Sequence, residues 1–121
     1  MSHRNRLSRH CLAITLAAGT ALTPAANATI LLWNNSLGGA ASTASNWNPV
    51  QAPTSADDLQ FSLNAAYTVT YNASSAASRT QTYRIGTVTL NCSAPHTVST
   101  GITVGSASPD IAVASLTSGV L

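Results

Sequence analysis

The sequence is short of charge, and the few charged residues are of only two kinds. Among its 121 residues, the five basic side chains are all arginine and the three acidic side chains are all aspartate. Lysine and glutamate, two of the better helix formers, are therefore absent. The serine, threonine and asparagine that supply polarity instead compete for backbone hydrogen bonds. This composition favours strands and turns over helices.

Residues 1–28 have the pattern of a secretory signal peptide. Three arginines precede a short apolar run from Cys11 to Leu22, and Ala26-Asn27-Ala28 supplies the small residues that a signal peptidase requires. The run is shorter than the roughly 20 residues needed to cross a bilayer, so we expect a cleaved helix and no membrane anchor. With Ala26 and Ala28 as the cleavage-site residues, the mature chain begins at Thr29. It would then be exported by a Sec-type route and be secreted or held at the outer cell surface.

Removal of residues 1–28 changes the charge balance. Arg79 and Arg84 then stand against Asp57, Asp58 and Asp110, a formal net charge of −1. Two separated arginines do not form a basic patch, and phosphate-driven binding needs several positive charges acting together. We therefore expect no nucleic-acid partner.

The residues that carry most metal and acid–base chemistry are also scarce. Cys92 is the only cysteine after the signal, so it cannot form an intramolecular disulfide, and we expect it to be buried. His96 follows it at a Cys-x-x-x-His spacing, but two ligands are too few for a structural zinc site. We interpret His96 as an exposed loop residue. The neighbouring Asp57 and Asp58 would point to opposite faces of a strand, so they could not flank one glycosidic bond. The sequence predicts no catalytic, cofactor or metal residues.

Short apolar alternations separated by glycine and proline predict an all-β chain. Thr68-Val69-Thr70-Tyr71 and Thr87-Val88-Thr89-Leu90 repeat one pattern, which aligns Thr68 with Thr87. Strands at a spacing of roughly 20 residues are typical of a parallel β-solenoid, and a small antiparallel β-sandwich is the alternative. Further strands are expected at residues 30–33, 59–61, 83–85, 97–98, 102–104 and 111–113.

The aromatic residues mark a boundary within the chain, since all of them lie between Trp33 and Tyr83. We expect residues 29–65 to form an aromatic N-terminal cap, with Asp57 capping the turn after Pro53. Residues 66–121 would form solenoid coils. The apolar end at residues 119–121 has no polar cap, which predicts that these coils are part of a longer solenoid.

The order of motifs in the cap resembles a known group of exported proteins. From Trp33 to Phe61 the chain has a Gly38-Gly39 loop, an Asn46-Trp47 pair, Pro53 and Asp57, and Thr-Val-Thr strands follow. This resembles the start of bacterial autotransporter-type passengers with autotransporter-associated β-strand repeats. The resemblance implies a β-solenoid displayed on the cell surface.

Three functions are compatible with the sequence. The first is a non-catalytic structural or adhesive module whose partners are surface glycans or other cells. The second is a carbohydrate-binding β-sandwich that stacks sugar rings on Trp33 or Trp47. The third is the front end of a carbohydrate-active β-helix enzyme whose catalytic residues lie beyond Leu121.

Overall fold

The computed structural model describes residues 27–105 and 110–118, and almost all of its regular structure is β-strand. The all-β expectation is confirmed. The expected signal helix, including Ala26, lies outside the described residues. The elements are β1 (Ile30–Trp33), β2 (Gly39–Ala40), the 3₁₀ helix η1 (Ala44–Asn46), β3 (Trp47–Asn48), β4 (Asp58–Phe61), β5 (Ala66–Tyr71), β6 (Ser78–Tyr83), β7 (Ile85–Cys92), β8 (Val98–Val104) and β9 (Ile111–Ser118).

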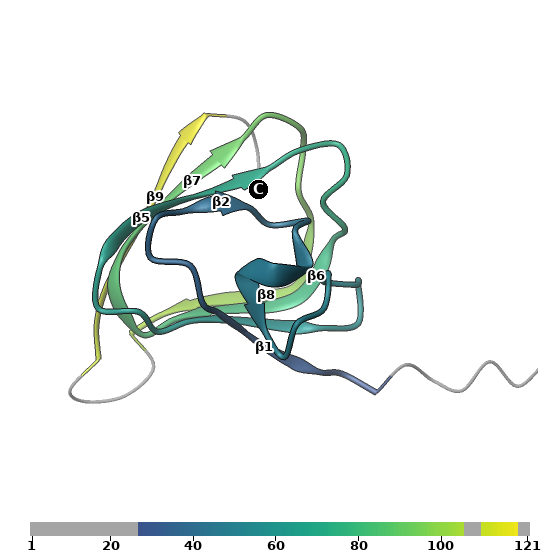
Figure 1. The fold of residues 1–121 in the computed structure, drawn as a ribbon, viewed down its shortest axis with the longest axis horizontal. Coiled ribbons are helices and arrows are strands. Elements are labelled where there is room, and N and C mark those ends of the chain that lie inside the picture. The colour runs from purple at the N-terminus through teal and green to yellow at the C-terminus, as the bar shows by residue number, and fades with distance from the viewer. Residues whose placement is uncertain (1–26, 106–109, 119–121) are drawn as a thin grey trace, which may run out of the picture.

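The strands form two sheets, and the chain passes repeatedly from one to the other. The first sheet has the order β3-β1-β4-β6-β8 and the second has the order β2-β5-β7-β9. In Figure 1 the two sheets lie on opposite sides of a closed outline, and each turn of the chain lies beside the one before. All strand pairs are parallel except β1 with β3.

The strand register shows how far the chain advances in each turn. In the second sheet Thr68 pairs with Thr89, and in the first sheet Asp58 pairs with Thr80. Both steps are close to the spacing of roughly 20 residues that is typical of a solenoid coil. Alignment of the repeated Thr-Val-Thr motif would pair Thr68 with Thr87, whereas the structure pairs Thr68 with Thr89, two residues later. A shift of two keeps each side chain on its original face, which explains why Val69 and Val88 are both buried.

The core lies between the two sheets and is built by alternation along each strand. In β5 and β7 the inward positions are buried while the intervening positions face outward. The outward positions of these two strands carry mainly threonine, whose β-branched side chain suits a pleated surface. The buried residues of the two strands are Tyr67, Val69, Tyr71, Val88, Leu90 and Cys92.

One break between strands differs from the sequence expectation. The sequence places a break at Gly86, but β6 ends at Tyr83 and β7 starts at Ile85, so Gly86 lies inside a strand. Its φ of +90° suits glycine, and a Cβ at this position would lie 2.2 Å from the Leu63 carbonyl oxygen. Gly86 is therefore needed for close approach of the preceding loop, and it does not end a strand.

Candidate functional site

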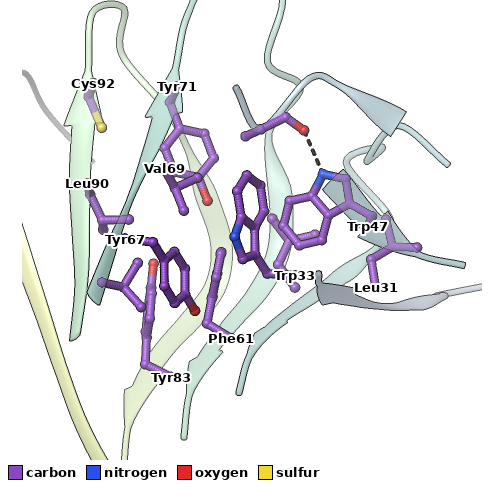
Figure 2. Close-up of a cluster of buried hydrophobic side chains, with 13 residues drawn as sticks. Leu31, Trp33, Trp47, Phe61, Tyr67, Val69, Tyr71, Tyr83, Leu90 and Cys92 are labelled. Atoms are coloured by element: carbon purple, nitrogen blue, oxygen red, sulfur yellow. Dashed lines mark hydrogen bonds between the residues drawn. The ribbon is translucent and has the colours of Figure 1, made fainter. Parts of the chain in front are cut away.

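Aromatic side chains from β1, β3, β4, β5 and β6 form one interlocked cluster between the sheets. Figure 2 shows Trp33 beside Trp47 and above Phe61 and Tyr67. The two indoles meet edge to face with centroids 5.0 Å apart, and Trp33 stacks on Tyr67 at 6.1 Å. Phe61 stacks on Tyr83 at 4.7 Å. Such geometries add attraction to the large apolar area that these rings bury.

Both tryptophans proposed as sugar platforms are buried in this cluster. Trp33 is 2% exposed and Trp47 is 0% exposed. Their ring N–H groups donate to the carbonyls of Asn35 (2.6 Å) and Ala41 (2.8 Å), the second shown as a dashed line in Figure 2. A sugar ring stacks only on an exposed aromatic face, and in this structure neither indole presents one.

The loop motifs around the tryptophans hold the cap together. The Asn35 amide donates to the Asn46 side-chain oxygen at 2.9 Å, and the Asn46 amide donates to the Ala40 carbonyl at 2.9 Å. A Cβ on Gly39 would lie only 2.9 Å from the Asn46 amide nitrogen. The Gly38-Gly39 and Asn46-Trp47 motifs therefore have a packing role in this structure.

Asp57 organises the turn before β4, as the sequence predicts. Its carboxylate accepts hydrogen bonds from the Thr54 backbone N–H and hydroxyl, both at 2.8 Å, and from the Gln51 amide at 3.3 Å. The Thr29 backbone N–H donates to its other oxygen at 3.1 Å. Burial raises the pKa of this carboxyl, but these hydrogen bonds outweigh burial and hold the pKa below 3.8.

The other charged side chains within residues 27–105 and 110–118 form two ion pairs between successive turns of the chain. Arg79 on β6 contacts Asp58 on β4, and Arg84 contacts Asp110 at 3.2 Å. The hydrogen bond from Arg79 lowers the pKa of the Asp58 carboxyl. Asp58 therefore faces outward while Asp57 is buried, which matches the predicted separation of the two carboxylates.

A buried polar network lies in the core next to the aromatic cluster. Gln81 of β6 donates through its amide nitrogen to the Tyr71 hydroxyl at 3.0 Å and to His96 Nε2 at 2.9 Å. Its side-chain oxygen accepts from the Tyr83 hydroxyl at 2.5 Å, and Ser78 Oγ lies 3.3 Å from His96 Nε2. Nε2 is therefore the ring nitrogen of His96 that faces Gln81 and Ser78.

His96 is a correction to the sequence interpretation. It is 3% exposed and not an exposed loop residue. Its ring lies 3.9 Å from that of Tyr71, and Nδ1 has no hydrogen-bond partner within the described ranges. Burial lowers the pKa of this imidazole. Sequence reasoning missed the network because Ser78, Gln81 and Tyr83 lie on a polar strand without apolar alternation, and their partners Tyr71 and His96 come from other parts of the chain.

Cys92 has the predicted environment. It is buried as a free thiol, and burial raises its pKa, so the reactive thiolate is disfavoured. Among the residues that the structure describes, no group of three or more His, Cys, Asp or Glu side chains could hold a metal ion.

A surface depression of about 320 Å³ lies on the outer face of the second sheet. None of the residues that line it is titratable, so its surface is suited to apolar contact. Its lining consists of Asn64, Ile85, Gly86, Thr87, Ile111 and Val113.

No protein-family model matches this chain, and comparison with curated proteins and solved structures finds no significant match. In residues 27–105 and 110–118, no helix has the length and apolar character needed to cross a membrane.

Proposed function

We propose that this chain is the N-terminal part of an exported bacterial β-solenoid of the autotransporter-passenger type, and that it is a non-catalytic structural or adhesive module. The observation that carries the proposal is the parallel pairing of strands from successive turns, Asp58 with Thr80 in one sheet and Thr68 with Thr89 in the other. A chain that alternates between two parallel sheets in this way stacks coil on coil. An antiparallel sandwich, the alternative, would pair its strands in the opposite sense.

The division into a cap and coils is part of the same proposal. The antiparallel strand β3 pairs with the edge of β1, and both tryptophans lie inside the cap segment, residues 29–65. From residue 66 onward each strand pairs in parallel with the one from the preceding coil. The first segment would thus close one end of the stack.

The outer surface is suited to contacts made by hydrogen bonds. Most outward positions of β5 and β7 carry hydroxyl or amide side chains, although β1 and β9 also expose apolar ones, and Arg79 and Arg84 are paired with aspartates. Such a surface favours short-range contacts with glycans or cell surfaces over long-range charge attraction. We do not propose sugar stacking on Trp33 or Trp47, because both indoles are buried.

The coil architecture is tested by adding one coil. A second copy of residues 80–100 inserted after Thr100 adds one full step of the register, since Thr80 pairs with Gly101. The stacked arrangement predicts cooperative unfolding at a midpoint close to that of the parent chain. The control is a partial insert, residues 80–90, at the same place, which should abolish cooperative unfolding. Loss of folding with both inserts would rule out the coil arrangement.

The biological role is tested on cells. Bacteria that express the full chain should display it at the surface, where antibodies detect it on intact cells, and should adhere to glycan-coated surfaces more than the empty host. The control is Leu16→Asp, which interrupts the apolar run of the signal and should keep the chain inside. Equal adhesion by both strains would refute the adhesive role.

A further inference from the structure

In the part of the chain that the structure describes, pairing with the first sheet begins at Thr29. Asn27 and Ala28 are exposed, whereas Thr29 is partly buried. The Thr29 carbonyl accepts a hydrogen bond from the Asp58 N–H at 2.9 Å, and the next residue, Ile30, pairs with Asp58 in the β1–β4 register. Within the described residues, the first one bonded to a strand of the sheet is therefore the one that the Ala26-Asn27-Ala28 pattern places directly after the predicted cleavage site.

The nitrogen of Thr29 lies against a buried carboxylate. Asp57 is 2% exposed, and its Oδ1 lies 3.1 Å from the Thr29 nitrogen. The donors to its other oxygen, from Thr54 and Gln51, are all neutral. Buried carboxylates are usually paired with a cation, but Arg79 and Arg84, the arginines that the structure describes, bind Asp58 and Asp110.

We propose that cleavage of the Ala28–Thr29 bond creates the missing cation, so that the new α-ammonium of Thr29 forms an ion pair with Asp57. Hydrolysis breaks the peptide C–N bond, leaves a carboxylate on Ala28 and gives Thr29 an amine that takes up a proton near neutral pH. The nitrogen is already within ion-pair distance of Oδ1. Removal of the signal would then lock the first strand onto the turn before β4. This inference rests on the proposed export of the chain.

The ion pair has a predictable pH dependence. An opposite charge at this distance favours the charged amine, so its pKa in the folded chain should rise above the ordinary α-amino value of about 7.7–8.0. The stabilisation is complete below the unfolded value and is lost as the pH rises through the folded one. Asp57 is the ionisable group that faces the amine. The nearby carboxylate of Asp58 is bound to Arg79.

The composition of the chain makes the amine easy to observe. Because residues 29–121 contain no lysine, the α-amino group of Thr29 is the single primary amine of that segment once the signal is removed. The exported protein is purified, its N-terminus is determined by mass spectrometry, and its acetylation by an N-hydroxysuccinimide ester is followed from pH 6 to 10. At pH 8 the folded protein should react about tenfold more slowly than the same protein in urea. Asp57→Asn should remove this protection, whereas Asp58→Asn should preserve it.

Two further samples keep the test decisive if Asp57→Asn does not fold. Processed protein that is acetylated in urea and then refolded has no ammonium, so it should lack the alkaline loss of stability. Unprocessed full chain, whose amine is on Met1, should lack it too. Equal acetylation rates in folded and unfolded processed protein would refute the ion pair and leave export intact. Cleavage at another bond would refute this site alone, while a chain that is never exported would refute both proposals.

Discussion

The two ends of the described stack carry the same alternation of inward and outward side chains, but they bury it differently. At the first end, Trp33 and Trp47 fill the space between the sheets and are almost fully buried. At the other end, the inward positions of β8 and β9 hold Ile102, Val104 and Leu116, which are 44%, 49% and 47% exposed.

The register identifies these three residues as inward-facing. Ile102 pairs with Gln81 and Val104 with Tyr83, while Leu116 pairs with Leu90 in the other sheet. The partners in the preceding coil are all buried. An inward position is thus buried only when side chains lie over it on both sides, or when a large aromatic cluster closes the end. The alternation of side chains along a strand specifies which face points inward. The extent to which the next turn of the chain covers that face determines how much its burial stabilises the fold.

The largest expected effect is at the closed end. Trp47→Ala should lower the free energy of unfolding by about 4 kcal/mol, because it leaves a cavity and removes the indole donor to the Ala41 carbonyl. Urea unfolding followed by circular dichroism measures the change. Val50→Ala is the matched control, since Val50 lies three residues away and is 75% exposed. A loss below about 1 kcal/mol for Trp47→Ala would contradict the closing role of this ring.

The buried network between the ends should make the fold sensitive to acid. Because burial lowers the pKa of His96 below 6.5, the unfolded chain binds a proton first as the pH falls. Stability should be complete above about pH 6.5 and should fall below it, by up to about 1.4 kcal/mol per pH unit, until the folded-state pKa is reached.

Urea titrations between pH 5 and 8 measure this slope. His96→Gln removes the titrating group and should flatten the curve, although it lowers stability overall. A parent protein with no pH dependence in this range would mean that His96 is equally accessible to protons in the folded and unfolded states.

A smaller effect is expected at the uncovered end. Ile102→Ala removes apolar area that is already 44% exposed, so it should cost about 1 kcal/mol. In a variant that carries a second copy of residues 84–104 after Val104, one register step of the first sheet, Ile102→Ala in the first copy should cost more, because the second copy would then lie over it. Equal costs in the two proteins would refute the idea that coverage makes the difference.

The smallest effect is expected from the outer ion pairs. Arg79→Gln removes the contact with Asp58, and because the arginine side chain is 46% exposed, the unfolding midpoint should shift only slightly. The shift should shrink further in 1 M salt, where charges are screened over a few ångströms. The same comparison for Arg84→Gln tests the Arg84–Asp110 pair, in which the Asp110 side chain is 3% exposed. A large, salt-independent loss for Arg79→Gln would contradict this ranking.

Strands with apolar alternation could be predicted from the sequence. The expected segment at residues 30–33 coincides with β1, and those at 59–61, 68–71 and 111–113 each lie within an observed strand. In 59–61 and 68–71 the apolar side chains at period two lie on the buried face of a sheet, whereas 30–33 is apolar throughout and the alternating Ile111 and Val113 face outward. The predicted segments at 97–98 and 102–104 belong largely to one strand, β8, because Gly101 continues its pairing.

Strand β6 and the position of His96 could not be predicted in the same way. The inward face of β6 carries Ser78 and Gln81, whose polarity is satisfied by His96 and Tyr71 from distant parts of the chain. A buried polar face looks like an exposed one in sequence, because the partners that make burial tolerable are not neighbours along the chain. For the candidate site, the capping role of Asp57 was predictable from its local turn, whereas its approach to Thr29, far earlier in the chain, was not.

The position of the two tryptophans has a consequence for spectroscopy. Both of the chain's indoles lie in the cap cluster, so intrinsic tryptophan fluorescence reports the closed end alone, whereas far-ultraviolet circular dichroism reports every strand. Coincident transitions by the two signals would identify a single cooperative unit. A circular dichroism transition that precedes the fluorescence transition would show that the uncovered coils melt while the cap is still folded.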